Sequence, residues 1–313
     1  MVTNPAPDVV VDTLWLATHL DAPNLRIVEC DADSRLYDHG HIPGAVRLDC
    51  QADLVDLASR DLVSRDELEA LAGRLGIGNG TDVVFYGDEH NILACHAYWV
   101  FRLFGHTRMK ILNGGRTRWI ADGQRLVRDV PRVAVSRYMS IDRTQEFRAL
   151  REDVLRHIGW PDPRFPRVNL IGRALVDDRS PAEYEGQFRP DGEYPARFRR
   201  SGHIPGACNL PWRELVRADG TFRTTEEIKR VLVRKGLTPE KDIVVYTRIG
   251  ERSSLVWFVL HELLGFPKVR NYDGSWTEWG NMVGMPIESS ALVRIPPNTA
   301  RPRSVEPILR ASA

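Results

Sequence analysis

Residues 247–252 (letters TRIGER) have the composition of an anion-binding loop. They follow an apolar segment, Ile243 to Tyr246, that reads as a buried strand. They precede an amphipathic segment, Ser254 to Leu264, that we expect to form a helix ending at Gly265. Backbone N–H groups at such a strand-to-helix turn lack partners and favour a negative charge, and two arginines would add to it. The stretch predicts a pocket that holds an anion over residue 247. The plainer alternative is an ordinary connection with surface arginines.

Length, composition and charge narrow the class of protein. The chain has 313 residues, 42% of them hydrophobic, which suggests two domains with substantial cores. Its formal net charge is +1, so the chain as a whole has no strong positive electrostatic field that would attract nucleic acid. The first eight residues lack the pattern of a signal peptide, and no apolar run approaches the roughly 20 residues that span a bilayer. We expect a cytoplasmic protein with neither nucleic-acid nor membrane partners.

The four cysteines are scattered over the chain, at Cys30, Cys50, Cys95 and Cys208. None belongs to a CxxC pair, and no metal-ligand spacing occurs. In a chain of this length such cysteines are typical of buried thiols in a cytosolic protein rather than of a disulfide framework. We therefore expect no metal site and no cofactor.

Strand-like and helix-like segments alternate along the chain. The expected strands are Leu25 to Cys30, Asp82 to Tyr86, Lys110 to Leu112, Leu170 to Asp177 and Ile243 to Tyr246. The expected helices are Thr13 to Leu20, a capped helix from Ser64 to Gly76, Ile92 to Phe104, one through Trp119, Arg151 to Ile158, and a capped helix after Thr224. This alternation indicates an α/β fold with parallel sheets flanked by helices.

The chain repeats itself at a spacing of about 160 positions. His41 to Ala45 matches His203 to Ala207, and Tyr86 to Gly105 aligns without a gap on Tyr246 to Gly265. A third match pairs Asn113 to Trp119 with Asp273 to Trp279. Three ordered matches predict two copies of one domain. We place the first in residues 1–135, a linker in 136–145, the second copy in 146–290 and a tail in 291–313.

The two copies differ at the position where chemistry is expected. Gly87 stands at the place of Thr247, and the acidic and polar residues 88–91 follow it. That loop has neither a nucleophile nor a basic rim. We therefore expect the site in the second copy alone, with the first copy supporting it across the domain interface, where small-molecule pockets often lie.

Five motifs give the chain its resemblance to a known family. They are the two His-Ile-Pro-Gly-Ala segments, Val176 to Tyr184, the 247–253 loop, and Asn271 to Gly280. Over nearly the whole chain it resembles the tandem-domain rhodaneses, the thiosulfate and 3-mercaptopyruvate sulfurtransferases, in wording closest to the actinobacterial type. The resemblance implies two rhodanese-like domains, the first non-catalytic and the second carrying the active loop.

In that family the first loop residue is a cysteine that carries sulfane sulfur as a persulfide, from thiosulfate or 3-mercaptopyruvate to a thiophile. Here this catalytic position is Thr247, a hard and weakly acidic hydroxyl that cannot carry a persulfide. The resemblance implies a small sulfur-containing anion as ligand and a protein thiol as one kind of acceptor. It assigns substrate binding to Arg248, Ile249, Gly250, Glu251, Arg252, Ser253 and Trp276, and structural support to Asp177, Arg179 and His203.

Some of these assignments have a structural alternative. Arg252 could hold the donor's anionic end or brace the loop by pairing with Asp177. His203 has a twin in the copy without a nucleophile, His41, so a hydrogen-bonding role is favoured over a general base. The loop has six positions, which matches sulfurtransferases rather than the related phosphatases, whose loop is one residue longer. Residues 186–200 could overhang the pocket or form a surface loop.

Three functions remain open from sequence. The first is a rhodanese-family sulfurtransferase acting through altered chemistry at Thr247, or carrying an introduced Cys→Thr replacement. The second is a non-catalytic homologue that binds an anion or a protein partner. The third is an enzyme recruited to another reaction in the same anion pocket, with the Thr247 hydroxyl as a hydrogen-bond donor.

Overall fold

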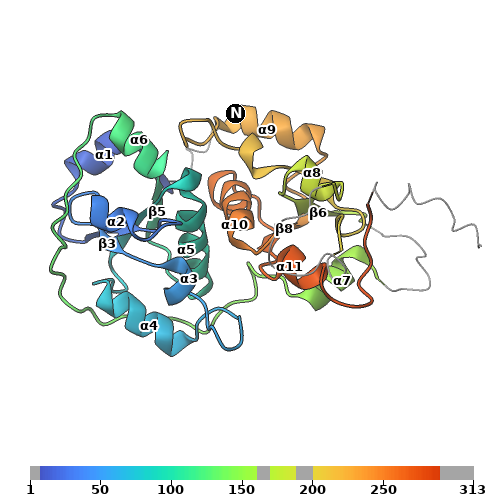
Figure 1. Cartoon of the computed structure of the whole chain (residues 1–313), viewed down its shortest axis with the longest axis horizontal. Coiled ribbons are helices and arrows are strands. Elements are labelled where there is room, and N and C mark those ends of the chain that lie inside the picture. Colours follow the sequence, from blue (N-terminus) through green and yellow to red (C-terminus); the bar gives the residue numbers. More distant parts are fainter. Residues whose placement is uncertain (1–7, 161–169, 188–199, 290–313) are drawn as a thin grey trace, which may run out of the picture.

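The structure, a computed structural model, describes residues 8–160, 170–187 and 200–289. They form two α/β halves that lie side by side (Figure 1). The expected tail 291–313 and most of the segment 186–200 lie outside the described residues. In the part of the chain that is described, no helix is both long and apolar enough to cross a membrane.

The first half is a parallel sheet covered by helices. Its strands are β1 (Val10–Val11), β2 (Leu25–Glu29), β3 (Val46–Arg47), β4 (Asp82–Tyr86) and β5 (Met109–Leu112), in the order β1-β5-β4-β2-β3. Its helices are α1 (Thr13–Thr18), α2 (Leu36–His39), α3 (Cys50–Asp53), α4 (Arg65–Arg74), the 3-10 turn η1 (Glu89–Asn91), α5 (Ile92–Leu103) and α6 (Gly115–Ala121). Ser64 caps α4 with the predicted box to Glu67.

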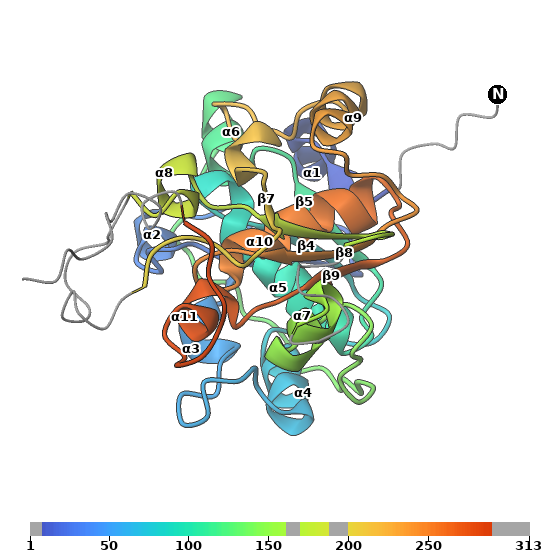
Figure 2. The ribbon, with the colours of Figure 1, turned by 90° about the vertical axis from the view of Figure 1, so that its right-hand side faces the viewer.

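The second half repeats this arrangement. Its strands are β6 (Arg173–Asp177), β7 (Cys208–Asn209), β8 (Asp242–Tyr246) and β9 (Val269–Asn271), all parallel, in the order β7-β6-β8-β9. Its helices are α7 (Arg151–Ile158), α8 (Pro181–Tyr184), η3 (Trp212–Glu214), α9 (Thr225–Arg234), α10 (Glu251–Trp257), the π-helical η4 (Phe258–Leu263) and α11 (Ser275–Trp279). Figure 2 views this half from its outer side.

The predicted helix from Ser254 to Leu264 ends within one residue of the expected position, at Leu263 before Gly265, but it differs at its start and in type. It begins earlier, at Glu251, where Gly250 reverses the chain with φ +88°. After Trp257 it continues as π-helix to Leu263 instead of ordinary α-helix. A π-helical stretch leaves no mark in the apolar periodicity, so the sequence could not have revealed it.

Both faces of each sheet are buried, which explains the near-continuous apolar strands. On one face of the second sheet, Val176, Ile243 and Val245 pack with α9 and α10. On the other face, Val244 and Tyr246 pack with α7 and α11. The first of these clusters runs without interruption into the first half, because α5 and α10 lie against each other in the middle of the molecule (Figure 1). The two copies therefore share one hydrophobic core.

The connector between the halves is tied to the first half. The N–H of Ser136 donates to Gly73 O (3.1 Å), and the N–H groups of Ile141 and Thr144 donate to Phe104 O (3.2 Å) and Leu103 O (2.9 Å). Beyond it, Arg148 bridges the halves. One Nη donates to Asp61 Oδ1 (2.6 Å), and the guanidinium also grips both carboxylate oxygens of Asp273 (2.9 and 2.7 Å). This bridge anchors the chain that carries Asp273 beside the 247–252 loop.

Removing the Arg148 bridge should destabilise the protein. The Arg148 side chain is 7% exposed and Asp273 is 15% exposed, so Arg148→Ala leaves the Asp273 carboxylate without this partner and should lower the free energy of unfolding by about 2 kcal/mol. Arg143→Ala is the matched control, because Arg143 also pairs with Asp61 (2.9 Å) but is more exposed, and it should cost less than about 1 kcal/mol. Urea denaturation measures both, and equal losses would contradict the bridging role.

Candidate active site

The predicted loop lies at the carboxyl end of β8, held by the start of α11. The Thr247 N–H donates to Ser275 Oγ (3.1 Å), and the Trp276 N–H donates to Thr247 O (3.0 Å). The Thr277 N–H and Oγ1 both donate to Arg248 O (2.9 and 2.8 Å). The loop carbonyls on this side are thus satisfied by α11. The motif from Asn271 to Gly280 and the 247–252 loop form one unit.

Gly250 turns its carbonyl into the protein. That oxygen accepts from the hydroxyls of Ser253 and Ser254 (both 3.1 Å) and from Asn271 Nδ2 (3.2 Å). Across the described residues, the backbone N–H groups of Ile249 to Arg252 have no hydrogen-bond acceptor. Such successive free N–H groups form a nest for an anion. The loop therefore carries unpaired N–H groups at the predicted strand-to-helix turn, and its role as an anion site stays a prediction.

Two clefts flank the loop and share Ile249 and Glu251. The smaller, of about 450 Å³, lies between the halves. Arg248 and Arg252 line it together with three carboxylates, those of Glu89, Glu183 and Glu251. Arg252 Nη2 lies 3.4 Å from Glu183 Oε1. Burial raises the pKa of Glu251. The smaller cleft therefore brings the two predicted loop arginines together on one side.

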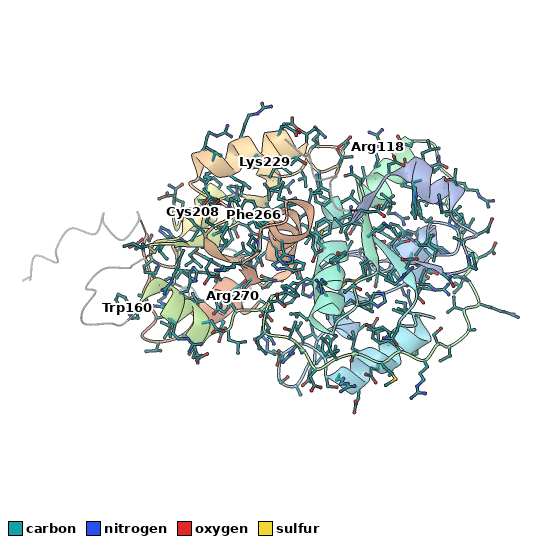
Figure 3. All side chains as sticks on the ribbon, turned by 180° about the vertical axis from the view of Figure 1, so that it is seen from behind. Arg118, Trp160, Cys208, Lys229, Phe266 and Arg270 are labelled. Carbon is teal, nitrogen blue, oxygen red and sulfur yellow. The ribbon has the colours of Figure 1, made fainter. Side chains whose placement is uncertain are left out.

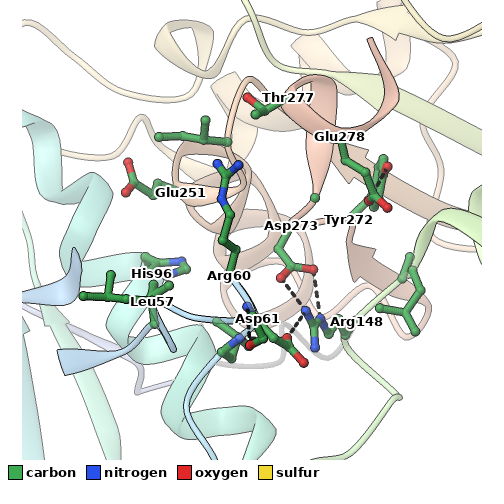
Figure 4. Close-up of a pocket in the computed structure, with 17 residues that line it drawn as sticks. Leu57, Arg60, Asp61, His96, Arg148, Glu251, Tyr272, Asp273, Thr277 and Glu278 are labelled. Carbon is green, nitrogen blue, oxygen red and sulfur yellow. Dashed lines mark hydrogen bonds and ion pairs between the residues drawn. The ribbon is translucent and has the colours of Figure 1, made fainter. Parts of the chain in front are cut away.

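The larger cleft, of about 700 Å³, lies between the two halves (Figure 4). From the first half come Leu57, Arg60 and His96, and from the second come Thr277 and the two shared loop residues. Arg60 has φ +61° and extends into the cleft toward the loop. The sequence offered no signal for Arg60, because nothing in residues 55–62 distinguishes it from other surface arginines.

Of the two roles considered for Arg252, the pairing with Asp177 is not found among the described residues. Arg179 holds Asp177 instead, through Nε (2.9 Å to Oδ1) and Nη2 (2.6 Å to Oδ2), and both side chains are buried. The Arg179 guanidinium also stacks over the Trp276 ring, 4.5 Å from its centroid. Among the described residues, Trp276 therefore lies beside Arg179 and lines neither cleft. The charge of the Asp177 carboxylate is balanced by Arg179. Arg252 is therefore not needed for that role and lines the smaller cleft beside the loop.

The two equivalent histidines have matching contacts. His203 stacks on Tyr184 (3.6 Å between centroids), and its Nδ1 lies 2.9 Å from Tyr184 O. His41 stacks on Tyr37 (3.8 Å), with Nδ1 at 2.9 Å from Tyr37 O. Neither histidine is among the residues that line the two clefts. These contacts suit a hydrogen-bonding role for His203.

Sequence reasoning missed a carboxyl beside Thr247. Asp178 and Thr247 follow the paired residues Asp177 and Tyr246 on adjacent parallel strands, so they emerge at the same edge. Both are fully buried. Burial raises the pKa of Asp178 to about 8, an effect that the Arg252 guanidinium and the Thr247 hydroxyl oppose. The sequence did offer a signal, because two acids, Asp177 and Asp178, follow each other at the end of the strand. Successive side chains point to opposite faces of a sheet, so Arg179 or any other partner of Asp177 need not pair with Asp178.

None of the four cysteines stands in for the missing thiol. Cys30, Cys50 and Cys95 are buried in the first half, and burial raises the pKa of Cys30 and Cys95 well above the usual range. Cys208 lies on β7, labelled in Figure 3, and burial raises its pKa to about 11. All four thiols are free. Since the thiolate is the nucleophile, the thiols with raised pKa values are poorly suited to accept sulfur.

The equivalent position in the first half has no room for a side chain. A Cβ on Gly87 would lie 2.2 Å from Cys30 O. The Gly87 N–H is taken by Asn91 Oδ1 (3.0 Å), and the residues Glu89, His90 and Asn91 all have positive φ. The first copy therefore differs from the second in backbone conformation as well as in residue type.

Comparison with known proteins decides the family. The family model of the rhodanese-like domain matches residues 12–122 and 163–282. The chain belongs to the rhodanese family. Among its relatives is the "Sulfur carrier protein TtuD" of Thermus thermophilus, 48% identical over 282 residues that cover 90% of this chain and 96% of the relative. Another, provisionally named thiosulfate sulfurtransferase, is from Mycolicibacterium smegmatis and is 42% identical over 90% of this chain and 98% of its own.

Solved structures of this rhodanese-family chain's relatives share its fold. SseA of Escherichia coli, a 3-mercaptopyruvate sulfotransferase, superposes with a TM-score of 0.68 at 26% identity, over 85% of this chain and 98% of its own. The anaerobic ergothioneine biosynthesis enzyme of Chlorobium limicola, with trimethyl histidine bound, gives 0.75 at 26% identity, over 90% and 70%. The predictions of a tandem rhodanese fold, of actinobacterial relatives and of a sulfurtransferase-like enzyme are confirmed. The domain boundaries and the individual site residues stay predictions.

Gly250 should tolerate no side chain. A Cβ there would lie 2.4 Å from Asp273 O and would also require a left-handed backbone, so Gly250→Ala should cost about 3 kcal/mol or more. Gly236→Ala is the matched control, because Gly236 also has positive φ (+66°) but nothing lies within 4 Å of its Cβ position. It should cost about 1 kcal/mol. Chemical denaturation compares the two, and similar losses would show that the close approach to Asp273 is unimportant.

Proposed function

We propose that this chain is a rhodanese-family sulfurtransferase that transfers sulfur without a protein persulfide. A small sulfur-containing anion, thiosulfate or 3-mercaptopyruvate, binds over the 247–252 loop, and its sulfur passes directly to a thiol or another thiophile. The observation that carries this proposal is the combination of free N–H groups from Ile249 to Arg252 with a buried hydroxyl, Thr247, at the position of the family cysteine.

The donor anion fits the side of the loop that carries the arginines. Arg248 and Arg252 line the smaller cleft, and guanidinium groups bind sulfonate and carboxylate oxygens through paired N–H donors. The names of relatives as sulfur carrier and thiosulfate sulfurtransferase support a sulfur-containing ligand and a protein thiol among the acceptors. The larger cleft, which opens on the same loop residues, offers the acceptor an approach.

Direct transfer balances chemically without a group on the protein. The acceptor thiolate attacks the outer sulfur of thiosulfate, the S–S bond breaks, and sulfite leaves with the bonding electron pair. The loop N–H groups and the two arginines would neutralise the charge that develops on the leaving sulfite. Thr247 takes no sulfur in this scheme, because an alcohol does not ionise at neutral pH and its buried oxygen is a poor nucleophile toward sulfur.

The remaining expectations belong to this proposal as well. Four free thiols and the absence of a disulfide among the described residues favour a reducing compartment such as the cytoplasm. A formal net charge of +1 gives no general attraction to nucleic acid, so we propose no nucleic-acid partner. The binding-only function and the recruited enzyme differ from this proposal in producing no sulfur transfer.

Initial rates of thiocyanate formation from thiosulfate and cyanide test the proposal. Direct transfer needs both reactants bound together, so reciprocal plots should intersect, and parallel lines would contradict the proposal by indicating a covalent intermediate.

Arg252→Gln should raise KM for thiosulfate by about tenfold, the value of one charge-assisted contact. Arg230→Gln, an exposed arginine on α9, should leave KM unchanged. Thiosulfate binding without any thiocyanate would replace direct transfer by the binding-only function.

A further inference from the structure

Three buried polar atoms meet beneath the loop without partners. Within the described residues, Asp178 Oδ1, Asp178 Oδ2 and Thr247 Oγ1 form no hydrogen bond of ordinary geometry. Most buried side-chain polar atoms in folded proteins have a partner, and leaving one unpaired costs stability. Unpaired atoms at a site of this kind indicate a functional constraint on the two residues.

The sheet itself brings the two residues together. The Asp178 N–H donates to Tyr246 O (3.0 Å), which places Asp178 alongside the last residue before Thr247. The Thr247 hydroxyl lies near enough to lower the pKa of the Asp178 carboxyl. The arrangement follows from the β6–β8 register and does not depend on the position of a loop side chain.

Few charged groups act on the Asp178 carboxyl. Arg252 of α10 and Arg179 lower its pKa, Asp177 raises it, and burial outweighs all three. Arg179 is committed to Asp177, and Arg252 is drawn toward Glu183 of α8. From η3 the contact is the Trp212 N–H, which donates to Asp178 O (3.1 Å). Burial thus favours the neutral acid, and ionisation would place a negative charge beside Thr247 at the base of the loop.

A negative charge at Asp178 would oppose any other negative charge at the loop. Like charges within about 4 to 6 Å shift each other's ionisation or binding by about tenfold or more. This holds for an anion lying over the free N–H groups and for a thiolate at position 247. A threonine at 247 adds no second charge, so it is compatible with Asp178 where a cysteine thiolate is not.

We propose that Asp178 is a specificity-determining residue of the 247–252 loop, which admits an external anion while it is neutral and excludes both that anion and a thiolate at position 247 when it is ionised. The proposal deepens the proposed function, since it concerns the same anion site. It also explains why the nest is retained while the sulfur-carrying atom is absent.

The first experiment measures thiosulfate binding by calorimetry at about pH 6.5 and about pH 9.5, a range in which thiosulfate stays a dianion. The unaltered protein should lose about tenfold in affinity at the higher pH, because Asp178 ionises. Asp178→Asn, which mimics the neutral acid, should keep its affinity at both pH values. A second neutral variant, Asp178→Ser, should behave in the same way. An equal loss in these variants, or no loss in the unaltered protein, would overturn the proposal.

Asp31→Asn is the matched control for titration in the same range. Burial raises the pKa of Asp31 to about 8 as well, but its carboxylate accepts from the Asp88 N–H (2.8 Å) in the first half. This variant should retain the pH-dependent loss of the unaltered protein. If Asp31→Asn abolishes the loss, Asp178 is not the group responsible.

The second experiment separates this proposal from the proposed function. Thiolate absorbance gives the pKa of the new thiol in Thr247→Cys and in Thr247→Cys/Asp178→Asn. The thiol pKa should be lower by about one pH unit or more in the double variant, since its carboxylate neighbour is gone. Equal thiol pKa values would overturn the role of Asp178. If thiosulfate fails to bind any of these proteins at about pH 6.5, the proposed function fails, while the thiol pKa values still decide the electrostatic role of Asp178.

Discussion

The inward carbonyl of Gly250 is the interaction on which the candidate site depends. Three donors, from Ser253, Ser254 and Asn271, hold that oxygen inside the protein. The N–H groups of Ile249 to Arg252 have no acceptor among the described residues, which is the arrangement that an anion-binding nest requires. Both halves support these donors, because Asn271 ends β9 in the second half and Ser254 Oγ lies 3.2 Å from His96 Nδ1 of α5 in the first half. The shared core between α5 and α10 therefore positions the loop as well as joining the two halves.

Each copy has a buried carboxylate at the end of a strand, and the arginine that pairs with it comes from a different element in each copy. In the first half, Arg116 of α6 reaches back to the buried Glu29 at the end of β2. In the second half, Trp276 occupies the place of Arg116, and Arg179 supplies the charge to Asp177 while stacking on that tryptophan. The exchange removes a guanidinium from the start of α11. The backbone contact is the same in both copies, since the Arg116 N–H donates to Gly87 O (2.9 Å) as the Trp276 N–H donates to Thr247 O (3.0 Å).

Most of the fold could be predicted because the sequence contains two copies of one domain, and the pattern of each copy supports the assignment of the other. The spacing of 160 positions places β8 on β4 and α10 on α5, and strands buried on both faces identify a parallel sheet. Side-chain partners across strands could not be predicted, because they depend on register and on the direction in which each side chain points. This is why the sequence left the partner of Arg252 open and why Asp178 escaped notice. Arg60 escaped for a different reason, since its place in the cleft depends on how the two halves pack.

The sulfur-transfer proposal rests on a contrast between two features of the site: groups suited to bind an anion are present, and a group suited to carry sulfur is not found in the part of the chain that the structure describes. Among the described residues, the unpaired loop N–H groups, Arg248 and Arg252 and the two clefts are present, while Thr247 and the thiols with raised pKa values, Cys30, Cys95 and Cys208, are poorly suited to hold sulfur covalently. A threonine beside a neutral carboxyl keeps the floor of the loop uncharged. This arrangement is the basis of the proposal that the site binds a negative ligand from outside rather than generating a negative sulfur of its own.

The most direct measurement is the intact mass of the protein after incubation with thiosulfate and removal of small molecules under denaturing conditions. The account predicts the mass of the unmodified chain, with the Thr247→Cys/Asp178→Asn variant serving as the positive control that gains one sulfur atom. A gain of one sulfur atom by the protein that carries Thr247 would contradict the account.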